Sequence, residues 1–119
     1  MPLRFLLDEN LDSLFRSALL RRQPDLVAWR VGDPGAPPIS TLDPAVLLWC
    51  EANRCALVTN NRRTMPVHLA DHLAAGHHVP GILVLRPRAS LDVLIDDLAL
   101  IAAAAGDDEY RDRIAYVPL

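Results

Sequence analysis

The sequence predicts an α/β fold, a three-layer α/β/α sandwich in which helices cover both faces of a mainly parallel sheet of about five strands. Short apolar runs alternate with segments whose apolar residues recur at helical spacing, and strands that are separated by helices pair in parallel. The hydrophobic fraction is 51% but the aromatic fraction is only 5%, so aliphatic side chains must fill the core between thin layers. The 119 residues suit one domain, and we expect residues 1–119 to form it.

The first strand and helix are indicated by a change of pattern near Asp8. Residues 3–7 (LRFLL) are continuously apolar up to Asp8, which is typical of a strand buried on both faces. Helical spacing of apolar residues begins near Asn10 and must stop before Pro24. Residues 26–31 (LVAWRV) then predict a second strand.

A loop and a second helix follow. Residues 32–41 contain two Gly and three Pro and cannot form regular structure. Either Thr41 or Asp43 can cap the next helix, and Pro44 suits its first position. The buried stripe expected on this helix is Ala45, Val46, Leu48, Trp49 and Ala52. Residues 55–59 (CALVT) predict a third strand.

The remainder of the chain repeats the alternation. A helix is expected at about 67–75 and a strand at 79–85. Ser90 is placed to cap a long helix, and residues 113–119 predict an edge strand, where a late proline does least harm. Connections of this length predict right-handed crossovers, and ligands of such sheets bind at the carboxyl ends of the strands.

Composition limits the function. The net charge is −3 and the isoelectric point is about 5.7, which disfavours general electrostatic coating of nucleic acid, so any phosphate contact must be local. All twelve basic residues are Arg, which a compositional bias explains more simply than phosphate recognition. Cys50 and Cys55 suit small buried hydrophobes better than a metal or redox pair. We expect a cytoplasmic protein without signal peptide or membrane anchor.

Polar residues with chemical potential follow the predicted strands. Asp8, Glu9 and Asn10 come after the first strand, residues 59–63 (TNNRR) after the third, and Asp43 begins a helix. A carboxylate at the exit of a buried strand suits Mg²⁺, which takes one or two carboxylates plus water and substrate phosphate. The alternative is that Asp8 simply caps the first helix.

Three segments carry a resemblance to a known family. FLLDENL at 5–11, a helix led by Asp43 and LVTNN at 57–61 resemble the PIN-like domain family of uncharacterised, toxin-like bacterial proteins. Its relatives include the ribonuclease toxins of toxin–antitoxin pairs. The resemblance implies a ribonuclease that uses Mg²⁺ or Mn²⁺ to hydrolyse phosphodiester bonds, with RNA and a cognate antitoxin protein as partners. A homodimer is also considered, and a membrane partner is not expected.

The resemblance assigns the catalytic and metal-binding roles to Asp8 and Asp43. Glu9 is a candidate general base, although it could equally serve the first turn of the helix. The family pattern after its third strand resembles T-x-D-x-D-F, and this chain departs from it because Asn61 and Arg63 replace the two acidic residues.

This departure leaves several functions open. In an active enzyme, Asn60, Asn61 and the arginines Arg62 and Arg63 would bind the substrate phosphate while the two aspartates hold one ion. Alternatively, the chain is a catalytically silent module that binds a protein partner or RNA, or residues 60–63 are merely a solvated turn. A receiver-like or nucleotide-binding domain is disfavoured, because the chain has neither Lys nor a Gly-rich phosphate loop.

The four histidines have three readings. His68 and His72 are four residues apart on one predicted helix, a spacing that can present two imidazoles to Zn²⁺, and His77 and His78 follow. The segment lacks the glutamate of an HExxH motif. A solvated helix face is the favoured reading, ahead of a phosphate or substrate contact and of a zinc site.

Overall fold

Strands and helices alternate strictly in the computed structural model, which describes residues 3–106 and 108–119. The strands are β1 (Arg4–Leu7), β2 (Ala28–Arg30), β3 (Cys55–Thr59), β4 (Ile82–Leu85) and β5 (Ile114–Val117). The helices are α1 (Leu14–Arg22), α2 (Asp43–Asn53), α3 (Met65–Ala74) and α4 (Leu91–Ala104). All strand pairings are parallel, in the order β2-β1-β3-β4-β5. The predicted α/β class with a five-stranded parallel sheet is confirmed.

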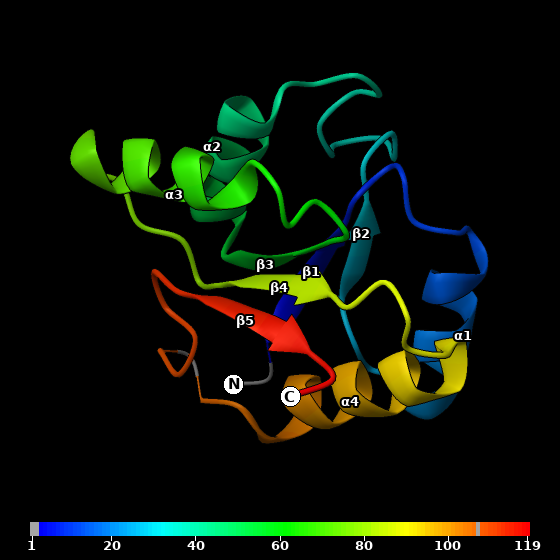
Figure 1. Ribbon diagram of the computed structural model, residues 1–119. Helices are drawn as coiled ribbons and strands as arrows, with labels where there is room; N and C mark the ends of the chain where they lie inside the picture. Colours follow the sequence, from blue (N-terminus) through cyan, green and yellow to red (C-terminus); the bar gives the residue numbers. More distant parts are fainter. Residues whose placement is uncertain (1–2, 107) are drawn as a thin grey trace.

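Two helices cover each face of the sheet (Figure 1). Because side chains alternate along a strand, Phe5 and Leu7 of β1 face one layer and Leu6 faces the other. The first layer is α1 and α4, where Leu19 and Leu98 are fully buried, and the second is α2 and α3. Both faces of the sheet are therefore buried, which accounts for its continuously apolar strands.

The connection through α4 has the opposite hand to the other three. The steps from β2 to β3, β3 to β4 and β4 to β5 all cross the sheet in one direction, yet α2 and α3 lie on one face and α4 on the other. Parallel crossovers are right-handed in about 98% of cases, so the expectation of uniformly right-handed crossovers is wrong here. If α4 lay on the same face as α2 and α3, α1 would have to cover the other face alone.

Some element boundaries differ from those expected. α1 begins at Leu14 rather than near Asn10, because the Asp12 carboxylate accepts the Leu14 amide at 2.9 Å and the preceding residues form a turn. α3 begins at Met65, since Pro66 is accommodated in its first turn. The Ser90 cap is confirmed, with its hydroxyl accepting from the amide of Val93 at 3.4 Å.

The buried face of α2 also differs from the predicted stripe. Leu47 and Cys50 are fully buried together with Val46, whereas Leu48 is 45% exposed. The expectation is wrong for Ala45, Leu48 and Ala52, which are all exposed. This helix is apolar over adjacent positions, so its spacing alone does not select the side that meets the sheet.

The two cysteines are free thiols in the interior. Burial raises the pKa of the Cys50 thiol well above its ordinary value and raises the pKa of Cys55 to about 11. Both therefore remain neutral near pH 7, as expected of small buried hydrophobes. No helix within residues 3–106 and 108–119 is long and apolar enough to cross a membrane.

Candidate functional site

Asp8 leaves β1 next to the end of β3. Its backbone amide donates to the carbonyl of Val58 at 3.0 Å, which continues the strand ladder by one residue. Leu7 pairs with Val58 in the sheet register, so the next residues along, Asp8 and Thr59, are neighbours. The buried Thr59 hydroxyl donates to Asp8 Oδ2 at 2.8 Å. The Asp8 carboxylate thus faces β3 and does not cap α1.

Asn61 connects this pair to Asp43. The backbone amide of Asn61 donates to the Thr59 hydroxyl oxygen at 3.1 Å, and the side-chain amide of Asn61 donates to Asp43 Oδ2 at 3.0 Å. Asp43 lies in the first turn of α2, and its side chain is 31% exposed. A continuous chain of hydrogen bonds therefore runs from Asp8 through Thr59 and Asn61 to Asp43, at the carboxyl edge of β1 and β3.

Asn61 makes two further contacts, both with Thr64. Its side-chain nitrogen also donates to the Thr64 hydroxyl at 2.7 Å, and its oxygen accepts from the Thr64 amide at 3.2 Å. Asn61 therefore positions Asp43 and the start of α3, rather than presenting an amide oxygen to solvent.

Glu9 contacts the loop that precedes α2. Its carboxylate accepts from the amide of Ser40 at 2.8 Å, which ties the loop before α2 to the end of β1. The guanidinium of Arg30 donates to the carbonyls of Glu9 at 3.3 Å and Leu11 at 3.1 Å. An ion pair between Arg16 and Asp33 anchors the same loop through two contacts. The structure thus gives Glu9 a tethering contact.

The arginines proposed from the sequence lie on the surface beside Asn61. Arg62 and Arg63 are exposed, and the amide of Arg62 donates to the Asn60 carbonyl at 3.1 Å in a tight turn. Asn60 is also exposed. Both arginines follow Asn61 directly along the chain, and positive charge near the aspartates attracts an anion such as phosphate and repels a second metal ion.

His68 is a member of the site that spacing alone did not identify. Its Nε2 lies 3.6 Å from Asp43 Oδ2, and its side chain is 26% exposed. His72, one turn further along α3, is buried and its Nε2 lies 3.0 Å from the carbonyl oxygen of His78 instead. The two rings contact different partners, so the geometry does not support the zinc interpretation of their four-residue spacing. The favoured expectation of a solvated helix face is wrong for His72, because its ring is buried.

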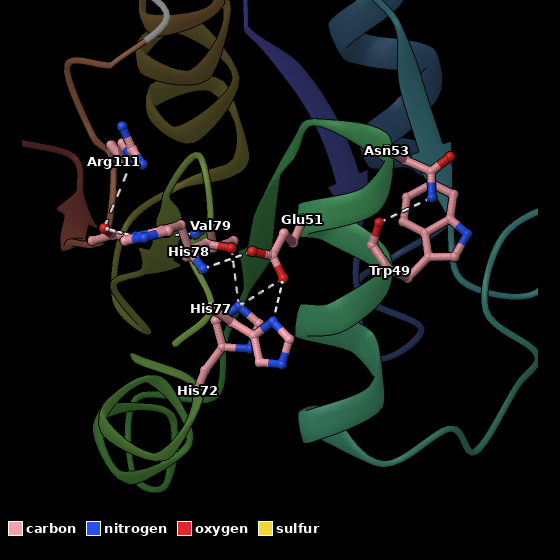
Figure 2. Close-up of polar contacts among 9 residues, drawn as sticks. Trp49, Glu51, Asn53, His72, His77, His78, Val79 and Arg111 are labelled. Carbon is pink, nitrogen blue, oxygen red and sulfur yellow. Dashed lines mark hydrogen bonds and ion pairs between the residues drawn. The ribbon is translucent and has the colours of Figure 1, made fainter. Parts of the chain in front are cut away.

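The other three histidines belong to a network at the amino edge of the sheet (Figure 2). Glu51 Oε1 lies 2.8 Å from His77 Nδ1, and Glu51 Oε2 accepts from the amide of His78 at 2.8 Å. His78 Nδ1 lies 2.7 Å from Asp112 Oδ2, and the rings of His72 and His77 stack with centroids 5.1 Å apart. This network joins α2, α3 and the segments before β4 and β5, far from the Asp8 edge.

Both carboxylates of this network have lowered pKa values. The hydrogen bond from the His78 amide is the main reason that the pKa of Glu51 is lowered. Burial raises the pKa of Asp112, but hydrogen bonds from His78 and Val79 outweigh it and the net direction is down. The network therefore stabilises the fold through two charged acids.

The donor set at the Asp8 edge suits one hard cation. Within residues 3–106 and 108–119 there is no group of three or more His, Cys, Asp and Glu side chains placed to hold a metal ion. Asp8 and Asp43 supply two carboxylates, and Mg²⁺ is commonly held by one or two carboxylates with water and substrate phosphate completing its shell. Two carboxylates are enough for one such ion and too few for two.

Comparisons with protein-family models, with curated proteins and with solved structures give no match to this chain. The sequence resemblance and the site geometry are therefore what support a function.

Proposed function

We propose that this chain is a PIN-like ribonuclease that uses one Mg²⁺ or Mn²⁺ ion at the Asp8–Asp43 site to hydrolyse phosphodiester bonds in RNA. The observation that carries the proposal is the hydrogen-bonded chain from Asp8 through Thr59 and Asn61 to Asp43. It fixes two carboxylates at the carboxyl edge of central parallel strands, the position where such sheets bind ligands.

Each residue of the site has a separate task in this proposal. Thr59 and Asn61 hold the carboxylates of Asp8 and Asp43 in place, and Arg62 and Arg63 attract the RNA phosphate. The bound ion supplies charge neutralisation and a lowered pKa of its water. A rigid pair of acids lowers the reorganisation required when the phosphate arrives.

The toxin role and its antitoxin partner belong to the proposal through the family resemblance. A toxin of this kind arrests growth when it is produced alone and is neutralised when its partner is produced with it. Co-expression with the product of an adjacent small gene tests this role, and unaffected growth in both cases would remove it.

A catalytically silent RNA- or protein-binding module is the second candidate. It is favoured by Asn61, which supplies a neutral donor to Asp43 where the family pattern has an acid. One carboxylate fewer lowers the attraction for a divalent ion.

Titration with Mn²⁺ separates the two candidates. We expect Mn²⁺ to raise the melting temperature and to activate cleavage of a generic RNA, and we expect Asp8→Asn to abolish both responses. Asp71→Asn, which removes an exposed acid of α3, is the matched control and retains both. Absence of both responses in the unmodified protein would exclude the nuclease and leave the silent module.

A further inference from the structure

We propose that the hollow lined by Asn10 and Asn60, at the carboxyl edge of the sheet, is a subsite for one nucleobase of a single-stranded RNA. The hollow has a volume of about 180 Å³ and lies between the turn after β1, the start of α1, the residue after β3 and the end of β4. It therefore opens at the same edge of the sheet as Asp8. The inference rests on the proposed function, because it concerns RNA held at that edge.

The floor of the hollow is apolar and rigid. Phe15, Leu85 and Leu94 line it, and each is at most 7% exposed. A volume of 180 Å³ corresponds to roughly six water molecules at about 30 Å³ each. This is smaller than a site for a complete drug-sized ligand, which usually occupies roughly 300–1,000 Å³. The space suits one planar ring system resting on the apolar floor.

The rim carries the groups that a base edge requires. Asn10 and Asn60 lie on it, and a carboxamide offers a donor and an acceptor side by side, as recognition of a nucleobase edge needs. Both residues are exposed, and neither side chain has a hydrogen bond to the residues that the structure describes. They are therefore available to a ligand.

A fixed cation completes the rim. Arg86 Nε donates to the carbonyl of Pro118 at 2.8 Å, and its guanidinium lies 5.6 Å from the centre of the Tyr116 ring. These contacts hold the guanidinium in place before a ligand arrives, so less side-chain entropy is lost on binding. Its remaining N–H groups can contact the phosphate that follows the base.

The combination favours RNA over an apolar peptide side chain as the occupant. An aliphatic side chain would bury the rim amides of Asn10 and Asn60 without hydrogen bonds, which is unfavourable. Unpaired RNA bases, in contrast, commonly rest on apolar or aromatic surfaces while their edges bond to side chains. The hollow and the proposed metal site are close along the chain, since Asn10 follows Asp8 by two residues and Asn60 follows Thr59 directly.

Binding measured in EDTA tests the subsite separately from cleavage. Hexamers of A, of C and of U are titrated while the side-chain amide signals of Asn10 and Asn60 are followed by NMR. We expect these two signals to shift for one base more than for the others, and Asn60→Ala to weaken that hexamer roughly 5-fold or more. Arg86→Ala is expected to weaken all three, whereas the matched change Arg88→Ala has little effect.

The outcomes distinguish this inference from the nuclease. Asp8→Asn is expected to abolish cleavage and to leave hexamer binding within about 3-fold of the unmodified protein. Hexamer binding therefore tests the subsite even if the protein cleaves no RNA. The subsite is wrong if the Asn60→Ala variant binds all hexamers as the unmodified protein does, or if only signals remote from the hollow shift. An aliphatic peptide is the alternative occupant. If it displaces no RNA from Asn10 and Asn60, the choice of RNA is supported. If it displaces RNA, the choice of RNA is wrong.

Discussion

Asn61 and Asp43 are joined by a hydrogen bond of 3.0 Å from the side-chain amide to the carboxylate. In the family pattern that Asn61 departs from, this position holds an acid, which would repel Asp43 unless a cation lay between them. The amide instead satisfies Asp43 directly, because it donates where an acid could only accept. Asp43 therefore has a hydrogen-bond partner without a metal ion.

Replacement of this amide by an acid, Asn61→Asp, should make the site depend on divalent cations. We expect the free energy of unfolding in EDTA to fall by about 1–3 kcal/mol, because a hydrogen bond becomes a contact between two carboxylates. Mn²⁺ should then raise the melting temperature more than it does in the unmodified protein. Asn53→Asp adds the same charge at the end of α2, away from the site, and should show no such gain.

The Thr59 hydroxyl should stabilise the site more than a surface hydroxyl does. Thr59→Val keeps the volume but leaves Asp8 and the Asn61 amide without their shared partner, so we expect a loss of about 1–3 kcal/mol in urea unfolding. Thr41 donates to the Pro38 carbonyl in an exposed loop, and Thr41→Val is the matched control. Equal losses in the two variants would contradict the role of Thr59.

Glu9 should act through its tether to Ser40 and not as a general base. Glu9→Gln keeps an oxygen that can accept from the Ser40 amide, so we expect cleavage within about 3-fold of the unmodified protein. Loss of a general base typically lowers the rate by roughly 10²–10⁴-fold. A loss of that size in single-turnover cleavage of RNA would return the catalytic role to Glu9.

Acid should weaken the network that Glu51 and Asp112 form. Both pKa values are lowered in the folded protein, so their contributions are fully present above the unfolded pKa values and are lost as pH falls through the folded ones. We expect unfolding free energy to decrease on acidification below about pH 5. Glu51→Gln with Asp112→Asn should flatten this dependence in urea titrations between about pH 5 and pH 3.

Both cysteines should resist thiol reagents in the folded protein. Burial keeps Cys50 and Cys55 neutral and inaccessible, and the thiolate is the reactive form. We expect no labelling at pH 7.5 over the time in which two thiols react fully in urea. Rapid labelling of one thiol without denaturant would indicate local opening of α2 or β3.

The sequence by itself determined the α/β class, because continuously apolar strands and helical spacing report burial one element at a time. It also placed Asp8 and residues 59–63 at strand exits, where parallel sheets bind ligands, and Asp43 at the start of a helix. Spacing along the chain was sufficient for these predictions.

Only the tertiary structure decided which of these residues meet and on which face each helix packs. Asn61 reaches Asp43, and His68 joins them, through contacts between elements that are separate in the sequence. The opposite hand of the connection through α4 likewise follows from covering both faces of one sheet. A local pattern fixes what one element buries, whereas partners and handedness depend on how all layers pack together.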